Sequence, residues 1–590
     1  MKVYFILFYI VLLSVYHSYA QQLPIIHSHN DYEQQVPLWQ AYAAGARSIE
    51  IDLFYKNKEL YVAHTQEEIV PERTLENLYL KPLEEAAEMK VLKKEPLQLV
   101  LDLKTTAKPT LKALMKQLKK YNKLIEGQDI QIIISGNQPQ PEDFKKYPSF
   151  IQFDYQSLEN LSPSEWERVG MISLDYSAYS VWNGKGRFTH EDLQRVKQVI
   201  EKAHRYQKPF RFWATPDSKS AWKAFYNLGV DFINTNKPFA CVNYLSSLPN
   251  RVYENQVFSK VYRPTFKNDG AATPVKNVIL LIGDGNGLSQ ISSSTLANGG
   301  ELTLTQLKNI GFIKTSSADD FTTDSAAAGT AIAIGKKTYN RAIGVDHLGA
   351  ESINICEVLQ EKNFNTAVIT TDEITGATPA AFYAHQKDRG MTQQIAADLY
   401  KSDLTLFAGG GAKYFKKQLP FNLVNTPEAI ANAKAARIGY FMADGGVPST
   451  LNGRGEELPK VVAHSLEFLK QKETPFFAMI EAAQIDSYGH FNDVAGIVSE
   501  GIDFDKAITE AVKFADENPG TLVIVTADHE TSGFSIPQGN LEHHTIEGDF
   551  TTHDHTATMV PVFAYGPQAQ GFTGVYENNE IYHKILALLR

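Results

Sequence analysis

Cysteine is scarce in this chain. Of its 590 residues only two are cysteine, Cys241 and Cys356. Two cysteines cannot form a disulfide framework, so a small fold held together by several bridges is excluded. We expect both thiols to be buried and unbridged.

Long apolar runs are nearly absent as well. The longest, Val3 to Val15, follows Lys2 and precedes Ser18-Tyr19-Ala20. This order predicts a secretory signal peptide in residues 1–20, cleaved before Gln21. A membrane anchor is the weaker alternative, because the run is shorter than the roughly 18 residues that a span needs. We expect an exported protein, periplasmic or extracellular, without a transmembrane span.

Positive charge is in deficit. The chain has 57 Lys and Arg against 67 Asp and Glu, a formal net charge of −10. Nucleic acids and anionic membranes attract proteins with an excess of positive charge, so we expect no nucleic-acid partner. Internal repeats and low-complexity segments are missing too. A chain of this length is too long for one core, so two or more domains are expected.

One segment has the composition of a connection between domains. Residues 249–274 include Pro249, Pro264, Gly270 and Pro274 and have few periodic apolar positions. The sequence therefore predicts one domain over residues 21–248, a linker over 249–274 and a second domain over 275–590.

In the first predicted domain, short apolar runs alternate with longer amphipathic stretches such as Lys108 to Leu124 and His190 to Tyr206. Repeated strand-helix units over about 228 residues favour a (β/α)₈ TIM-like barrel, with an open doubly wound sheet as the alternative. The runs are Pro24–His27, Ser48–Leu53, Leu60–Ala63, Leu97–Leu101, Ile130–Ile134, Phe210–Ala214 and Asp231–Asn234.

The second predicted domain contains almost wholly apolar runs, which are typical of parallel strands buried on both faces. They are Asn277–Ile282, Asn365–Thr370, Pro475–Ile480 and Thr521–Val525. Polar or acidic residues follow each run. Since the carboxyl ends of parallel strands meet at one edge of a sheet, these residues are expected to converge on one crevice.

The residues gathered there have the chemistry of phosphate-ester hydrolysis. Ser325 follows Asp324 and precedes a run of small residues that favours a helix start. A hydroxyl at a helix N-terminus is placed to receive a phosphoryl group, although Ser325 taken alone also fits a simple helix cap. The downstream carboxylates and imidazoles are of the types that bind zinc.

Residues 275–590 contain a series of separated motifs: Ile282-Gly283-Asp284-Gly285, Thr323-Asp324-Ser325-Ala326-Ala327, Ala377-Thr378-Pro379, Glu481 through His490, Thr526-Ala527-Asp528-His529-Glu530 and His555-Thr556. In their residues and their order these motifs resemble the alkaline phosphatases. The resemblance implies an α/β/α sandwich with a mostly parallel sheet.

The resemblance implies a role for each site residue. Ser325 is the nucleophile that forms a phosphoserine, and Arg389 binds two phosphate oxygens, a geometry that lysine cannot supply. Two zinc ions and one magnesium ion are implied. The first zinc is held by Asp486, His490 and His555, the second by Asp284, Asp528 and His529, and the magnesium by Asp284, Thr378 and Glu481. Gly376 departs from relatives, which commonly carry Asp or His beside the magnesium site.

Sulfatases and phosphoglycerate mutases share this architecture and are the alternatives within it. The positions of Arg389, Thr378 and Glu481 favour a phosphomonoesterase acting on small phosphomonoesters. The segment between Arg389 and Glu481 is short for a family that often adds interface elements there, which favours a monomer.

Polar residues also follow the runs of the first domain, where a barrel has its catalytic face. The pattern, with Glu50-Ile51-Asp52 and the late segment Phe212 to Pro238, resembles the glycerophosphodiester phosphodiesterases. The resemblance implies that Glu50, Asp52 and Asp102 bind Ca²⁺ or Mg²⁺, that His27 and His64 exchange protons, and that Lys104 holds the phosphate. His27-Ser28-His29 replaces the family's His-Arg-Gly, so an arginine facing the phosphate is missing.

The two resemblances together predict a pathway from diester to free phosphate. The barrel would release a phosphomonoester, and the second domain would hydrolyse it. The alternative is a non-catalytic barrel that binds a glycan or a lipid headgroup and tethers the phosphatase. A third alternative is a purely structural protein. It would require that the zinc-binding residue types occur in this order by chance.

Overall fold

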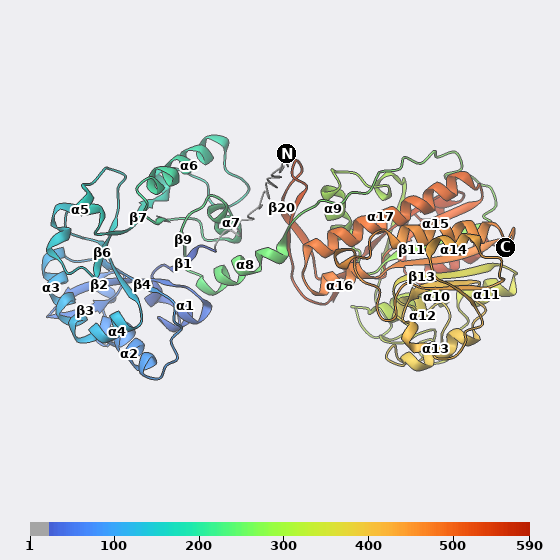
Figure 1. The fold of residues 1–590 in the computed structure, drawn as a ribbon, viewed down its shortest axis with the longest axis horizontal. Helices are drawn as coiled ribbons and strands as arrows, with labels where there is room; N and C mark the ends of the chain where they lie inside the picture. The colour runs from blue at the N-terminus through green and yellow to red at the C-terminus, as the bar shows by residue number, and fades with distance from the viewer. Residues whose placement is uncertain (1–22, 590) are drawn as a thin grey trace, which may run out of the picture. The chain divides into compact units, whose positions relative to one another are not determined.

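The computed structural model describes residues 23–589, so the predicted signal peptide, residues 1–20, lies outside the described residues. The chain forms two compact units that divide between Leu248 and Pro249 (Figure 1). Among the described residues, no helix has both the length and the apolar character needed to cross a bilayer.

The first unit is a closed barrel of parallel strands. β1 pairs with both β2 and β9, which closes the ring and decides against the open sheet. The eight strands of the ring are β1 (Ile25–Ser28), β2 (Ser48–Lys56), β4 (Leu97–Leu103), β5 (Ile130–Gly136), β6 (Ile151–Tyr155), β7 (Val169–Asp175), β8 (Phe210–Trp213) and β9 (Phe232–Thr235). The predicted TIM-like barrel is confirmed.

The sequence prediction lacks two strands of the ring, and one of the predicted strands lies outside the ring. β6 and β7 carry polar residues toward the barrel interior, where Ser135 and Ser173 donate hydrogen bonds to the fully buried Asp154. Such positions break the apolar pattern that reveals a strand. The run at Leu60 forms β3 (Glu59–Val62), an antiparallel strand on the edge of β2 and not part of the ring.

Helices connect the barrel strands. The predicted stretch Lys108 to Leu124 is divided into α3, a 3₁₀ turn and α4, whereas His190 to Tyr206 forms the single helix α6. The helices of this unit are α1 (Trp39–Ala44), α2 (Lys81–Glu88), α3 (Ala107–Leu118), α4 (Asn122–Gly127), α5 (Pro163–Trp166), α6 (His190–His204), α7 (Lys219–Asn227) and α8 (Pro238–Arg251), the last of which runs through the division between the units.

The second unit contains a ten-stranded, mostly parallel sheet. In sheet order its strands are β15 (Asn422–Val424), β16 (Ile438–Phe441), β14 (Leu406–Gly410), β13 (Asn365–Glu373), β17 (Phe476–Ala482), β11 (Asn277–Gly283), β18 (Thr521–Thr526), β23 (Val560–Tyr565), β12 (Asn309–Lys314) and β24 (Gly574–Glu577). The four predicted parallel strands are the neighbours β13, β17, β11 and β18 at its centre. β23 runs antiparallel to both β18 and β12.

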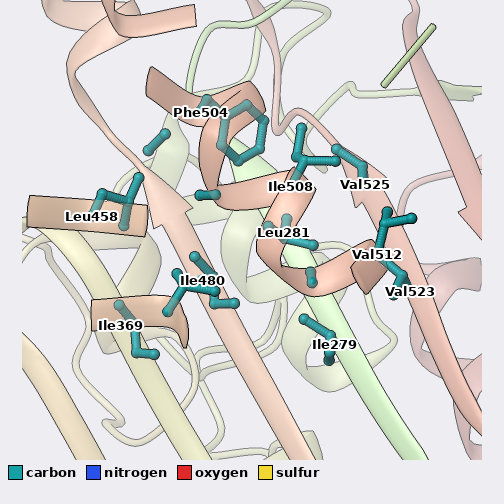
Figure 2. Packing of buried hydrophobic residues seen from close by; sticks show 14 of the residues in the cluster. Ile279, Leu281, Ile369, Leu458, Ile480, Phe504, Ile508, Val512, Val523 and Val525 are labelled. Carbon is teal, nitrogen blue, oxygen red and sulfur yellow. The ribbon is translucent and has the colours of Figure 1, made fainter. Parts of the chain in front are cut away.

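Each central strand is buried on both faces. In β11, Ile279 and Leu281 belong to one apolar cluster, and Leu280 belongs to the other (Figure 2). Helices α15 (Glu457–Lys470) and α17 (Val494–Glu517) supply the first cluster, whereas α10 (Ser325–Ile334), α11 (Ile355–Glu361) and α18 (Glu580–Leu588) supply the second. Full burial of one such aliphatic side chain contributes about 2 kcal/mol, so both helical layers are strongly held to the sheet.

The segment for which a linker is predicted packs against the second unit. β10 (Val252–Glu254) pairs with β21 (Thr545–Asp549), and the Ser259 hydroxyl donates to Asp505 at 2.7 Å. Cys241 and Cys356 are buried, free and in different units, as expected.

Candidate functional site

The central strands of the second unit bring its acidic residues together. Ile282 pairs in register with Glu481 of β17 and with Thr526 of β18. The loops after β11 and β18 carry Asp284 and Asp528 to the same edge of the sheet, and α16 (Gln484–His490), which follows β17, carries Asp486 there. The Gly285 N–H donates to Asp528 Oδ1 at 3.1 Å and joins two of these loops.

Gly285 is required at this junction. Its φ of 67° lies in the left-handed region, and an added Cβ would lie 2.6 Å from Thr531 Oγ1 and 2.9 Å from Asp486 Cα. A larger residue would strain the backbone and push the loop that carries Asp284 away from Asp486 of α16.

Two groups of three side chains have the geometry of metal sites. One comprises Asp486, His490 and His555, and the other Asp284, Asp528 and His529; within each group one ligand atom per residue lies within 4.8 Å of the others. These are the two sets for which zinc is predicted. Carboxylate and imidazole ligands suit zinc, so the donor chemistry fits the implied metal.

Hydrogen bonds orient the imidazoles. His490 Nδ1 lies 2.6 Å from the His553 carbonyl, and His555 Nδ1 lies 2.8 Å from the Thr323 carbonyl. A carbonyl can only accept, so each Nδ1 carries the proton. The two Nε2 atoms lie 3.1 Å apart and face Asp486. This is the arrangement by which second-layer groups hold histidine ligands toward a metal.

The other group has carboxylate oxygens without partners. Asp284 Oδ1 and Asp528 Oδ2 are buried and accept no hydrogen bond. Burial raises the pKa of Asp528 to about 6, with the charge of Asp486 adding to the effect, and burial raises the pKa of Asp284 well above its ordinary value. Buried carboxylates in this condition need a cation, which a metal ion would supply.

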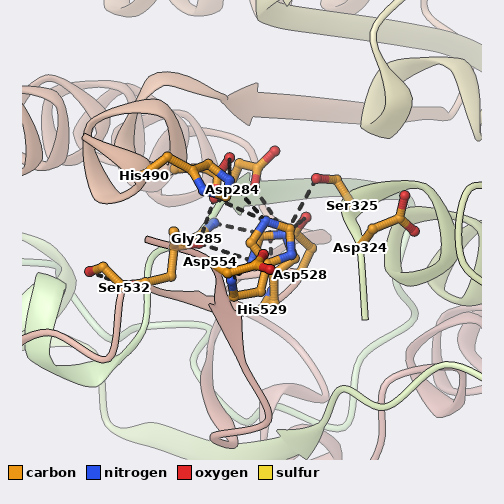
Figure 3. Close-up of polar contacts among 12 residues, drawn as sticks. Asp284, Gly285, Asp324, Ser325, His490, Asp528, His529, Ser532 and Asp554 are labelled. Carbon is orange, nitrogen blue, oxygen red and sulfur yellow. Dashed lines mark hydrogen bonds and ion pairs between the residues drawn. The ribbon is translucent and has the colours of Figure 1, made fainter. Parts of the chain in front are cut away.

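Ser325 lies beside this group. It is the first residue of α10, and its hydroxyl lies 3.3 Å from His529 Nε2 (Figure 3). The side chain of Asp324 caps the helix by accepting the Ala327 N–H at 2.9 Å. Asp324, not Ser325, is therefore the helix cap, and the Ser325 hydroxyl faces the candidate metal ligands.

Asp324 has a second contact that the sequence reasoning did not assign. Its Oδ2 accepts a hydrogen bond from Arg389 Nη1 at 3.1 Å. The ion pair ties the guanidinium to the residue that immediately precedes Ser325. The signal was present in the motif, because Asp324 immediately precedes the nucleophile.

Glu481 and Thr378 form a third polar group beside Asp284. Thr370 donates a hydrogen bond to Glu481 Oε2. Burial and, second, the negative charge of Asp372 raise the pKa of Glu481 to about 8, while the Thr378 hydroxyl lowers it. Thr378 is 1% exposed, and its hydroxyl makes no hydrogen bond of ordinary geometry. A carboxylate and a hydroxyl oxygen together fit the magnesium predicted here.

In the barrel, Glu50 has a different environment. Glu50 Oε2 accepts a hydrogen bond from Arg211 Nη1 at 2.6 Å and lies 2.8 Å from His27 Nε2. Arg211 is 3% exposed and is 3.6 Å from Asp154 on its other side. Burial and the guanidinium charge lower the pKa of His27 to about 3, so this ring is neutral.

The remaining predicted barrel residues gather around a lysine. Lys104 Nζ lies 3.0 Å from both Asp52 and Asp102, and Asp52 also accepts from the Tyr32 hydroxyl at 2.8 Å. The predicted proton carrier His64 lies 3.3 Å from Asp52 and its side chain is 51% exposed.

The fit of a metal to this barrel site is poor. Each of the three predicted ligands already contacts Arg211 or Lys104, and one carboxylate oxygen, Asp52 Oδ1, is buried without a partner. Among the described residues, the groups with metal-site geometry are both in the second unit. The metal expected at Glu50, Asp52 and Asp102 stays a prediction.

The sequence reasoning missed one barrel residue, Arg211, and left the role of His29 open. Arg211 is central to the barrel site, although the sequence offered only a basic residue within the predicted strand Phe210–Ala214. The side chain of His29 is 30% exposed, 3.7 Å from Glu50, and hydrogen-bonded to Asn236 at 2.7 Å. His29 therefore faces the site from the rim, while His27 lies beneath it.

The barrel matches two phosphodiesterase family models in part. The AIM6-like phosphodiesterase domain matches residues 19–95, and the glycerophosphoryl diester phosphodiesterase family matches residues 209–238. These segments include His27, Glu50, Asp52, His64 and Arg211.

The second unit matches known proteins over most of its length. The chain is 36% identical to alkaline phosphatase 4 of Bacillus subtilis over 289 residues, which is 44% of this chain and 63% of that protein. The structure of the alkaline phosphatase from the Antarctic bacterium TAB5 has a TM-score of 0.51 and 43% identity, covering 54% of this chain and 98% of that one. A variant of that enzyme with an aspartate in place of a histidine was solved with Mg in its M3 site; it is 42% identical, has the same TM-score and covers the same shares.

The alkaline phosphatase family model matches residues 275–422, 412–549 and 542–590, which is more than half of the chain and includes every candidate residue of the second unit. The chain therefore belongs to the alkaline phosphatase family through its second unit.

Proposed function

We propose that the second unit hydrolyses small phosphomonoesters through a phosphoserine at Ser325. The observation that carries this proposal is the 3.3 Å between the Ser325 hydroxyl and His529 Nε2, beside unpartnered carboxylates and at the start of α10. A serine with only a capping role would turn its hydroxyl to the helix N–H groups, a role that Asp324 already has.

The chain's own residues account for the positioning steps. Arg389, held by Asp324, binds the phosphate oxygens, and the N-terminus of α10 stabilises negative charge on the phosphoryl group. The Ser325 Oγ attacks phosphorus, the bond from phosphorus to the alcohol oxygen breaks, and the alcohol leaves with a proton. Water then attacks the phosphoserine, the bond from Oγ to phosphorus breaks, and inorganic phosphate is released. Two displacements retain the configuration at phosphorus.

Three metal ions complete the proposed site. Asp486, His490 and His555 would hold one zinc, Asp284, Asp528 and His529 the other, and Asp284, Thr378 and Glu481 a magnesium, in line with the Mg found in the TAB5 variant. Bound zinc acts as a Lewis acid that lowers the pKa of a hydroxyl or water and stabilises a leaving oxygen.

The test compares the mature protein with Ser325→Ala and with the matched control Ser292→Ala. Ser292 is also a helical serine, but its hydroxyl donates to the Leu288 carbonyl, and Ser292 lies outside the candidate site. We expect Ser325→Ala to lose phosphate release from a phosphomonoester by roughly 10³-fold or more at unchanged zinc content, while the control keeps parent activity. Full activity in Ser325→Ala would sink the proposal.

For the barrel, we propose hydrolysis of glycerophosphodiesters to a phosphomonoester. The supporting observation is the ring of accessible groups around paired carboxylates. The side chains of His29, His64 and Lys104 are 30%, 51% and 28% exposed, so two histidines and one cation face a substrate. The predicted proton carrier His27 is fully buried and held neutral by burial and Arg211, so we propose that His29 takes its place beside His64, and that Lys104 contacts a phosphate oxygen. The non-catalytic barrel that binds a glycan or lipid headgroup is the second candidate.

Supplying a glycerophosphodiester to the Ser325→Ala protein separates these candidates. A diesterase barrel accumulates glycerol phosphate, because the second step is blocked. His64→Asn should lower that accumulation by about 10²-fold or more if His64 transfers a proton. A Ser325→Ala protein that leaves the diester intact would favour the binding module.

The two activities in series would make an exported phosphate scavenger. We assign residues 1–20 to the signal peptide, 21–248 to the barrel, 249–274 to the connection and 275–590 to the phosphatase, and we propose a monomer. Unchanged growth on glycerophosphodiesters after loss of the protein would count against the scavenging role.

A further inference from the structure

Arg341 has a backbone conformation that favours glycine. Its φ of 74° lies in the left-handed region. A side chain retained at such a position points to a function when it makes a contact that glycine could not make. Arg341 makes one: its Nε donates to Asp388 Oδ2 at 2.7 Å, and its Nη2 donates to Asp388 Oδ1 at 2.8 Å. Two parallel hydrogen bonds fix the orientation of both side chains.

This ion pair lies at the base of the proposed phosphate ligand Arg389, because Asp388 is the residue before it. The Arg389 N–H donates to the Arg341 carbonyl at 2.7 Å. On the other side, the Gly390 N–H donates to Asp388 Oδ1 at 2.7 Å. The backbone at position 389 is therefore held from both directions by Arg341 and its partner.

Arg341 also contacts the residue that binds the other end of Arg389. The Arg341 N–H donates to Asp324 Oδ1 at 3.0 Å, and Arg389 Nη1 donates to Oδ2 of the same carboxylate at 3.1 Å. The contacts form a closed ring, from Arg341 to the backbone of Arg389, along its side chain to Asp324 and back. Since Asp324 precedes Ser325, this ring connects the proposed phosphate ligand to the proposed nucleophile.

Arg389 depends on such support because regular structure does not supply it. It lies in the stretch between α12 (Ala377–Ala380) and α13 (Thr392–Lys401), outside the helices and strands that the structure describes. Its side chain is 35% exposed, and its 3.1 Å bond to Asp324 is longer than both bonds from Arg341 to Asp388. A long side chain loosely bound at its tip reaches one position only when its backbone is fixed.

Arg341 is not itself placed to bind the phosphate. The two nitrogens of its guanidinium that would grip an oxyanion, Nε and Nη2, already donate to Asp388. The hydrogen bond from Arg341 is the first cause that lowers the pKa of Asp388 to about 2, so the pair stays charged at neutral and alkaline pH. Arg341 must therefore act through its partner.

We propose that Arg341, through its ion pair with Asp388, is a positioning residue that fixes the backbone of Arg389 and so directs the Arg389 guanidinium to Asp324 and to a phosphate oxygen. This inference rests on the proposed function of the second unit. It assigns a role to two residues that lie outside the nucleophile, the phosphate ligand and the candidate metal groups.

The test measures binding of inorganic phosphate to the zinc-loaded full chain by isothermal titration. We expect Arg341→Gly to weaken phosphate binding roughly tenfold. Glycine adopts this φ readily, and the neighbouring bridge between Ile343 and Gln386 does not use the Arg341 side chain, so the fold should persist. The melting temperature should change little, because the side chains of Arg341 and Asp388 are 58% and 42% exposed.

The matched control is Arg263→Ala. Arg263 belongs to another exposed ion pair of the same unit, with Glu301 at 2.8 Å. Neither residue is in the candidate site, so phosphate binding should stay at the parent value.

Two further variants separate positioning from net charge. Asp388→Asn removes a negative charge beside Arg389, so a pure charge effect would tighten phosphate binding, whereas positioning predicts that binding weakens roughly tenfold. Arg341→Lys keeps the positive charge but cannot form the two parallel bonds, so it should also weaken binding.

A double substitution tests whether Arg341 acts through Arg389. In the Arg389→Ala background, Arg341→Gly should have no further effect on phosphate binding, because the side chain that it positions is absent. A further tenfold loss there would overturn the inference, as would tighter phosphate binding in Asp388→Asn or affinity within twofold of the parent in Arg341→Gly. Failure of the proposed function would look different, since the unmodified chain would then bind no phosphate and release none from a monoester.

Discussion

The two units gather carboxylates at the carboxyl ends of parallel strands but neutralise them in opposite ways. In the barrel, Arg211 and Lys104 supply fixed positive charge to Glu50, Asp52 and Asp102. In the phosphatase unit, Asp284 and Asp528 have buried oxygens with no hydrogen-bond partner, and the nearby His529 ring, whose pKa is lowered by burial, supplies no fixed charge. The positive charges of the barrel site are side chains of the protein itself, whereas the proposed site of the phosphatase unit would bind its cations from solution.

The difference shows that the same residue types do not imply the same chemistry. A Glu-x-Asp motif near histidines fits a metal site in the sequence, but a buried arginine can occupy the place of the ion. Unpartnered buried oxygens are the sharper sign of a missing cation, because leaving them unsatisfied is costly.

Metal removal should produce the largest difference between the units. Chelation is expected to lower phosphomonoester hydrolysis roughly 10³-fold or more and to destabilise the phosphatase unit, because its ligands then repel one another. The barrel should unfold at an unchanged temperature. All five tryptophans lie in the barrel, so their fluorescence reports its unfolding alone. A barrel transition that moves by several degrees with Ca²⁺ or Mg²⁺ would break the comparison.

Matched carboxylate-to-amide changes should act with opposite sign on stability. Glu50→Gln leaves Arg211 without its closest anion and is expected to cost the barrel about 3 kcal/mol. Asp284→Asn removes repulsion with Asp528 and should stabilise the metal-free phosphatase unit by about 1 kcal/mol, while abolishing metal binding at that group. Tryptophan fluorescence in urea measures the first effect and calorimetry of the chelated protein the second. If both substitutions destabilised their units, the carboxylates of the two sites would be neutralised by the protein in the same way, and the comparison would be wrong.

Acid should weaken the barrel gradually. Burial and Arg211 lower the pKa of His27 from 6.5 to about 3. Between these two pH values His27 is protonated in the unfolded chain but neutral in the folded barrel. The barrel therefore loses stability as the pH falls from 6.5 toward 3, at up to about 1.4 kcal/mol per pH unit from this residue.

The measurement is urea unfolding at pH 7 and pH 4.5, followed by tryptophan fluorescence. His27→Asn should show less acid sensitivity than the parent, and the exposed His347→Asn should match the parent. Equal sensitivity in all three proteins would mean that His27 is not held neutral by Arg211.

Local patterns were enough to predict the framework. The apolar runs of β11, β13, β17 and β18 are buried on both faces, and such strands show themselves as continuous apolar segments. β6 and β7 were not predicted, because Asp154 and its serine partners are polar residues turned into the barrel. In the sequence, buried polar residues cannot be told from surface residues, because the partners that satisfy their hydrogen bonds are distant along the chain.

The sequence by itself determined the order of motifs, the strand–helix alternation and the residue types at each strand end, because these depend on spacing along the chain. Tertiary structure alone decided which charges meet. Arg211 is 161 residues from Glu50, and Arg389 meets Asp324 across 65 residues of the chain. Electrostatic partners are set by distance in space, and that distance follows from how the strands pair rather than from any local signal.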